Sequence, residues 1–158
     1  MSFRRLAVLA VLAPGAAHAQ ETAAGDPEAG ADHFNSQCVS CHVVQDDSGQ
    51  ILAGRNGHVG PNLYGVIGRP AGSYPGFNYS TLMKAYAATG AVWGEENFVP
   101  YVQDPTDFLR GASGETSGRS KMAYQVRDPQ EAQDLYAFLS TFAGEGAAAP
   151  ADGGAASQ

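Results

Sequence analysis

The chain has 158 residues, a length that suits a single domain. It carries 9 lysines and arginines against 16 aspartates and glutamates, so its formal net charge is −7. This acidic balance argues against nucleic acid as a partner, because phosphate binding needs clustered cations. Four of the cationic residues lie close together in the sequence: Arg110, Arg119, Lys121 and Arg127. This grouping indicates either a local positive face or a solvated loop.

The first 20 residues have the pattern of a cleaved export signal. Arg4 and Arg5 precede a short apolar run, and Ala17, His18 and Ala19 supply a small-x-small cleavage pattern. The apolar run is too short to span a bilayer, which takes about 20 apolar residues, and no later stretch is predicted to span one. Removal of residues 1–20 takes away two arginines and no acid, so the net charge becomes −9. We therefore expect an exported, acidic protein.

A helix is predicted to begin at Asp26, which suits the N-cap, with Pro27 at the first helical position. It should end near Gln37. Gly30 and Phe34 stand four residues apart and therefore share one face of this helix. A glycine inside a helix costs about 1 kcal/mol relative to alanine, so Gly30 indicates a close crossing with another element.

Residues 46–76 are rich in Gly, Pro, Asn and Asp and show neither a helical nor a strand period. A compact domain seldom holds so long an irregular run unless the run wraps something or is functional. Residues 111–120 are likewise predicted to be a loop. No strand pair is expected anywhere in the chain.

Two short helices are predicted between these loops. The first covers residues 81–89 and is closed by Gly90. The second covers residues 95–103, with Pro100 expected to kink it and Asp104-Pro105 to stop it.

The last helix has the clearest signature, because Asp128, Pro129 and Glu131 give an N-cap, a first-turn proline and a capping-box acid. Its apolar residues form a wide stripe: Ala132, Leu135, Tyr136, Phe138, Leu139 and Phe142. The Ala- and Gly-rich residues 144–158 lack large apolar side chains and are predicted to be a disordered tail. The expected fold is all-α and rich in loops.

Cys38 and Cys41 are the only cysteines, in the motif Cys-x-x-Cys followed directly by His42. A disulfide oxidoreductase site would sit in an alternating strand and helix pattern, which is absent here. A zinc site needs four ligands, and the remaining histidines have no zinc-finger spacing. A disulfide across two residues would constrain little chain.

Cys-x-x-Cys-His is the attachment sequence for a c-type haem, in which the thiols bond the porphyrin and the histidine binds iron. The sixth iron position then decides between electron transfer and ligand chemistry. Four residues are candidates for it: His33, His58, Met83 and Met122. His33 is expected to be exposed, His58 to lie in a polar loop and Met83 to fill the core, whereas Met122 lies in a loop that can present its sulfur.

Five motifs in this order resemble the class I c-type cytochromes, especially the bacterial cytochrome c2 group, over residues 26–142. They are CVSCH (38–42), GPNLYGVIGR (60–69), GFNYS (76–80), YVQDP (101–105) and KMAY (121–124). The resemblance implies a class I cytochrome c fold of four to five helices around one covalently bound haem c, spanning residues 21–143.

The resemblance also implies residue roles. Cys38 and Cys41 would form the thioether links, with His42 and Met122 as the axial ligands of the iron. Pro61 would accept a hydrogen bond from the His42 ring. The haem surroundings would include Arg69, Tyr79, Ser80, Trp93 and Tyr101, and the first helix would cross the last one with Gly30 and Phe34 against Leu135 and Phe138.

The chain departs from the short members of that family in three respects. Loops 44–59 and 110–120 are longer, Pro100 interrupts the distal helix, and the ring of basic residues used for docking is sparse.

The function implied is that of a periplasmic, monomeric electron carrier and not an enzyme. It would shuttle single electrons from a bc1-type donor complex to an oxidase, a reaction centre or a reductase, by transient electrostatic docking led by Lys121, Arg119 and Arg127 and without membrane insertion. The alternatives are a haem enzyme or sensor with an open sixth position, and a haem-bearing subunit of a larger oxidoreductase.

Overall fold

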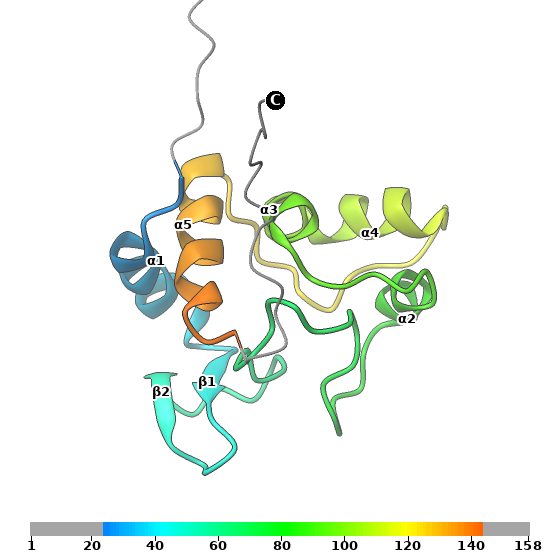
Figure 1. Cartoon of the computed structure of the whole chain (residues 1–158). Helices are drawn as coiled ribbons and strands as arrows, with labels where there is room; N and C mark the ends of the chain where they lie inside the picture. The colour runs from blue at the N-terminus through cyan, green and yellow to red at the C-terminus, as the bar shows by residue number, and fades with distance from the viewer. Residues whose placement is uncertain (1–23, 144–158) are drawn as a thin grey trace, which may run out of the picture.

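A computed structural model describes residues 24–143 of the chain (Figure 1). The expected export signal and the expected disordered tail lie outside these residues. In chain order the described elements are α1 (Pro27–His33), η1 (Phe34–Cys38), β1 (Val43–Gln45), β2 (Ile51–Gly54), α2 (Thr81–Ala87), α3 (Glu95–Gln103), α4 (Pro105–Ser113) and α5 (Pro129–Ser140). Within this part of the chain, none of the helices is both long and apolar enough to cross a membrane.

Helices α1 and α5 lie side by side and cross closely at Gly30 (Figure 1). A Cβ atom at Gly30 would lie 2.0 Å from the backbone oxygen of Asp134 and 2.7 Å from Cβ of Phe138. Phe34 is fully buried, and its ring centroid lies 5.5 Å from that of Phe138. The close crossing expected from Gly30 is therefore confirmed.

The N-terminal caps of these two helices form much as expected. Asp26 accepts a hydrogen bond from the Glu28 N–H at 2.8 Å, and Asp128 accepts one from the Gln130 N–H at 2.8 Å. The capping box expected at Glu131 is wrong, because that carboxylate instead accepts a hydrogen bond from the side chain of Gln37 in η1. The first helix continues to Cys38 as the π-helical turn η1.

The expectation that the chain has no strand pair is wrong. Strands β1 and β2 pair antiparallel, with Val43 opposite Gly54 and a bulge after Val44. Their connection is stabilised locally, since the Asp46 carboxylate accepts hydrogen bonds from the N–H groups of Ser48 and Gln50, each at 2.9 Å. Strands of three and four residues are too short to show a clear alternating pattern.

Helix α3 has the predicted bounds and runs through Pro100. Asp104-Pro105 ends it and also begins α4, which sequence analysis missed. The Asp104 side chain caps α4 by accepting from the Asp107 N–H at 3.0 Å, and Gly114 closes it with φ of 75°. The loop predicted over residues 111–120 therefore begins later than expected, after Ser113.

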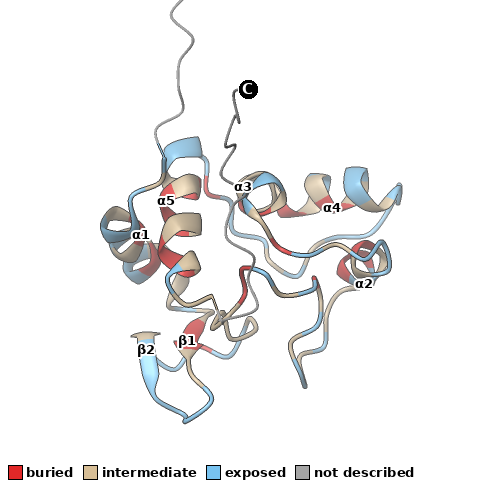
Figure 2. Cartoon of the chain, in the orientation of Figure 1, coloured by how far each residue is buried: buried red, intermediate tan, exposed pale blue. Residues whose placement is uncertain are grey.

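The buried residues come from the inner faces of the helices, from β1 and from the irregular segments between them (Figure 2). Helix α5 packs against α1 and α3, and α2 packs against α4. Rings from α2, α3 and the segment before α3 form much of the core, with Tyr86, Trp93 and Phe98 all buried. The irregular segment between β2 and α2 joins these two groups of helices and forms one side of a central cavity.

Candidate haem site

The ten residues assigned to the haem from the sequence all line one cavity. The cavity encloses about 1100 Å³ of space between the atoms, including its open mouth. Three groups of these residues converge on it: the turn after η1 (Cys38, Cys41, His42), the segments before α2 and α3 with α3 itself (Pro61, Arg69, Tyr79, Ser80, Trp93, Tyr101), and the segment after α4 (Met122).

Cys38 and Cys41 belong to one turn of backbone at the end of η1. The N–H groups of Cys41 and His42 both donate to the Cys38 carbonyl, at 3.0 and 2.9 Å. The two thiols are not bonded to each other. Burial raises the pKa of Cys38 to about 11, with a smaller contribution from Cys41. A redox dithiol needs a lowered thiol pKa, so this environment disfavours that alternative.

The His42 ring is held in one orientation. Its Nδ1 lies 2.8 Å from the Pro61 carbonyl, the contact expected from the sequence. Burial lowers the pKa of His42, opposed in part by that hydrogen bond, so the neutral imidazole that binds metals is favoured. A carbonyl at Nδ1 also leaves Nε2 as the nitrogen for a metal ion.

Gly60 shows how tightly this ring is enclosed. A Cβ atom at Gly60 would lie 2.2 Å from Cε1 of His42, and the Gly60 N–H donates to the Cys41 carbonyl at 2.8 Å. The loop thus follows the Cys-x-x-Cys-His turn closely. In the part of the chain that the structure describes, no three His, Cys, Asp or Glu side chains gather as a metal site.

Both methionines considered from the sequence reach the cavity. Met83 is buried in α2, where its position suits core packing, yet it also lines the cavity. Met122 is half-buried in an irregular segment, and its N–H donates to the Ser120 hydroxyl at 3.2 Å. Met122 therefore lies outside the helices, in the loop context expected of a residue that presents its sulfur.

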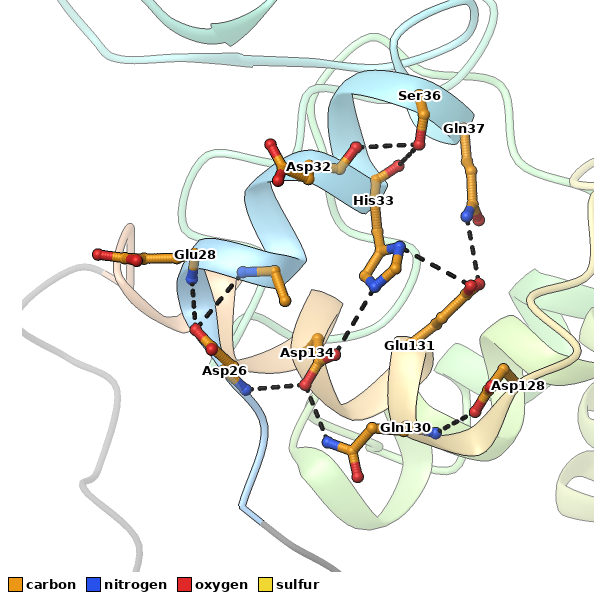
Figure 3. A network of polar contacts seen from close by, with 11 residues as sticks. Asp26, Glu28, Asp32, His33, Ser36, Gln37, Asp128, Gln130, Glu131 and Asp134 are labelled. Carbon is orange, nitrogen blue, oxygen red and sulfur yellow. Dashed lines mark hydrogen bonds and ion pairs between the residues drawn. The ribbon is translucent and has the colours of Figure 1, made fainter.

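The two histidines considered for the sixth position are not among the lining residues. His58 lies 2.7 Å from the Asn56 side-chain oxygen. The expectation that His33 is exposed is wrong, because it is half-buried between α1 and α5, 3.9 Å from Glu131 and 3.7 Å from Asp134 (Figure 3).

Arg69 is largely engaged by the loop that carries it. Its guanidinium donates to the carbonyls of Asn62 and Tyr64, each at 3.0 Å, and lies 5.3 Å from the centre of the Tyr74 ring. Burial lowers the pKa of Arg69. The side chain therefore braces residues 62–69 against the cavity and brings a positive charge to its wall.

Tyr79 and Ser80 also have protein partners. The Ser80 hydroxyl accepts a hydrogen bond from the Met83 N–H at 3.1 Å and so caps α2. The Tyr79 hydroxyl accepts one from the Tyr74 N–H at 3.2 Å, which leaves its own hydrogen available to a ligand.

Trp93 and Tyr101 form an aromatic wall, with ring centroids 4.8 Å apart. Burial raises the pKa of Tyr101 to about 12, opposed in part by a hydrogen bond with Ser120. Ser120 therefore contacts both this ring and the backbone of Met122, a role that sequence analysis missed. It also missed that Leu135 and Leu139 line the cavity, although the apolar stripe of the last helix was visible.

Comparison with known proteins identifies the family. The family model described as "Cytochrome c" matches residues 27–143. The chain belongs to the cytochrome c family. It is 48% identical over 141 residues to a cytochrome c2 of Cereibacter sphaeroides, covering 89% of this chain and 94% of that protein. It is 53% identical over 117 residues to a cytochrome c2 of Rhodovulum adriaticum, covering 74% and 92%.

Solved structures of cytochromes agree with this fold. The cytochrome c2 of Rhodobacter sphaeroides matches with a TM-score of 0.73 and 48% identity, over 75% of this chain and 97% of that one. Ferric cytochrome c-550 of Paracoccus versutus matches with a TM-score of 0.70 and 34% identity, over 76% and 99%. The class I cytochrome c fold, one covalently bound haem c and an electron carrier instead of an enzyme are thereby confirmed.

Proposed function

We propose that this cytochrome is a periplasmic shuttle that carries single electrons between membrane-bound redox complexes. The observation that carries the proposal is that the Cys-x-x-Cys-His turn and Met122 meet on one largely apolar cavity. The donor would be a bc1-type complex, and the acceptor an oxidase, a photosynthetic reaction centre or a reductase. The relatives named cytochrome c2 and the export pattern of residues 1–20 support the periplasmic assignment.

The bound haem supplies an iron that changes between Fe(II) and Fe(III). Cys38 and Cys41 would hold its porphyrin through thioether bonds, and His42 and Met122 would be the protein ligands of the iron. His42 is kept neutral by burial and oriented by Pro61. With His42 and Met122 both bound to the iron, no position would be open to a substrate, which suits electron transfer, and a methionine ligand would raise the potential.

The remaining site residues would enclose the macrocycle. Trp93 and Tyr101 would cover it with apolar surface and keep water out. Arg69, which brings a positive charge to the cavity wall, and the hydroxyl hydrogen of Tyr79 would stabilise its anionic propionate groups. Ser80 would fix the start of α2 beside those groups.

The cations near the cavity are proposed to guide docking. Lys121 lines the cavity and is exposed, with its ammonium 5.7 Å from the centre of the Phe77 ring. Arg119 and Arg127 are exposed as well, and no carboxylate among residues 24–143 forms an ion pair with any of the three. Uncompensated cations on an acidic protein produce a directed field that orients it toward an acidic surface.

Reduction of the oxidised protein by a purified bc1-type complex should therefore depend on salt. Raising the ionic strength from about 0.01 to 0.15 M shortens the Debye length from about 30 to 8 Å, so the second-order rate constant in stopped-flow measurements should fall. Lys121→Glu should lower the rate constant at low salt by at least about threefold. The matched charge reversal Arg55→Glu, at an exposed residue outside the cavity lining, should have a smaller effect. A rate constant indifferent to ionic strength would contradict electrostatic docking.

A further inference from the structure

We propose that Tyr124 and Gln37 are positioning residues whose hydrogen bond ties the segment carrying Met122 to the turn carrying Cys38. The Tyr124 hydroxyl donates to Oε1 of Gln37 at 3.1 Å. Tyr124 lies two residues after Met122, and Gln37 directly precedes Cys38. The inference rests on the proposed function, in which these two segments hold the haem from opposite sides.

The other hydrogen bonds of the Met122 segment lead elsewhere. Among the described residues, the hydrogen bonds that join segment 120–126 to other parts of the chain reach the distal half of the molecule, at Asn78, Tyr101, Val102, Asp104 and Thr106. These partners lie in or beside α2, α3 and α4. Within residues 24–143, the Tyr124 hydroxyl is the one group of this segment that hydrogen-bonds to the residues before the Cys-x-x-Cys-His turn, so it joins the two halves that enclose the cavity.

Gln37 is itself held for this role. Its Nε2 donates to Oε2 of Glu131 at 3.2 Å (Figure 3). Because this bond fixes the amide group, Oε1 of Gln37 points to the Tyr124 hydroxyl and accepts its hydrogen bond. Glu131 in turn lies 3.9 Å from His33, which sits between α1 and α5. The bond to Tyr124 is thus anchored on the closely packed pair of helices instead of on a free surface side chain.

Because Tyr124 is exposed, its hydroxyl group can be removed without disturbing the packing of the core. The residue is 49% exposed, so its ring contributes little to the core, and Tyr124→Phe removes chiefly the hydrogen bond. A net hydrogen bond of this kind shifts an equilibrium by about two- to tenfold, and its exposure favours the lower half of that range. The measurable consequence is easier opening of the Met122 segment away from the haem.

The experiment uses the ferric holoprotein and two readouts. Imidazole added in solution displaces a methionine ligand only when the segment opens, so its apparent affinity reports the opening equilibrium. Hydrogen exchange of the amides in residues 120–126 reports the same opening whether or not Met122 binds iron. Tyr124→Phe should raise both the imidazole affinity and the exchange rates by about two- to fivefold. Gln37→Ala should act similarly, and adding Tyr124→Phe to it should produce no further change.

Tyr136→Phe is the matched control, since it removes the same hydroxyl from a half-buried ring on α5 that packs against Phe98. It should leave both readouts unchanged. The proposal is overturned if Tyr124→Phe leaves exchange of residues 120–126 at the wild-type rate, if Tyr136→Phe changes it equally, or if the effects of Tyr124→Phe and Gln37→Ala simply add. A wild-type protein without methionine-bound iron would refute the proposed ligand, while the exchange measurement would still decide on the Tyr124–Gln37 bond.

Discussion

Replacement of Met122 by alanine should lower the midpoint potential of the bound haem by on the order of 0.1 V or more, within the span of about 0.8 V that axial ligands set. A thioether ligand favours Fe(II), and water in its place favours Fe(III). The variant should also lose the weak absorption band that ferric iron shows when bound by methionine sulfur. Redox titration followed in the visible spectrum measures both changes. The reduced variant should bind carbon monoxide readily, whereas the unaltered protein should not.

Met83→Leu is the control for this prediction, because Met83 lines the same cavity from α2. Leucine nearly conserves its volume, so the substitution should cost less than about 1.5 kcal/mol and leave the methionine band and the potential close to their original values. Loss of the band in Met83→Leu, with retention in Met122→Ala, would reverse the ligand assignment. Carbon monoxide binding by the unaltered protein would favour a sensor or enzyme with an open sixth position.

The Asp-Pro pairs in the sequence predicted the starts of two helices correctly. Asp26-Pro27 and Asp128-Pro129 each gave an N-cap and a proline in the first turn, and both helices begin there. Asp104-Pro105 carries the same signature, and α4 begins at it. The same two residues also end α3, and an interpretation of Asp104-Pro105 as a stop alone does not predict α4.

Other features depend on contacts that no local pattern encodes. The β1–β2 hairpin is stabilised by burial of Val43 and Val44 and by turn hydrogen bonds to Asp46. The position of His33 between two carboxylates of α5 follows from the helix crossing. Which of several polar groups a side chain contacts depends on the tertiary structure and not on the local sequence.

In the haem site too, residue identities were predictable from the sequence, whereas contacts between side chains were not. The attachment motif and the resemblance to the class I cytochromes predicted ten side chains that line the cavity, because holding a haem demands particular chemistry in a fixed order along the chain. Their hydrogen-bond partners were less predictable. Arg69 donates to two carbonyls of its own loop, and Ser80 caps α2, so both have structural duties besides lining the cavity.

Gly30→Ala should lower the free energy of unfolding of the ferric holoprotein by roughly 3 kcal/mol, the upper end of the usual cost of overpacking. The added methyl carbon would lie 2.0 Å from the Asp134 carbonyl oxygen, a backbone atom that cannot rotate away. Helices α1 and α5 would have to separate. Denaturant unfolding followed by the visible absorbance of the haem, which stays covalently attached, measures the loss.

Gly111→Ala supplies the matched control. Gly111 lies within α4, and a Cβ atom there would meet nothing within 4 Å. Alanine in an unobstructed helical position should stabilise the protein by up to about 1 kcal/mol, so the same substitution has opposite signs at the two sites. A Gly30→Ala protein as stable as the original would show that α1 and α5 can move apart at little cost.

The effect of Gly30→Ala should extend to the haem, because both helices that meet at Gly30 also contribute to the site. Helix α1 leads through η1 directly into Cys38, and α5 supplies Leu135 and Leu139 to the cavity wall. Moving α5 outward would open this apolar wall to water, and water near the iron stabilises the more highly charged Fe(III) form. The midpoint potential of Gly30→Ala should therefore fall while the absorption band of methionine-bound iron is retained, a combination that distinguishes loosened packing from loss of the axial ligand.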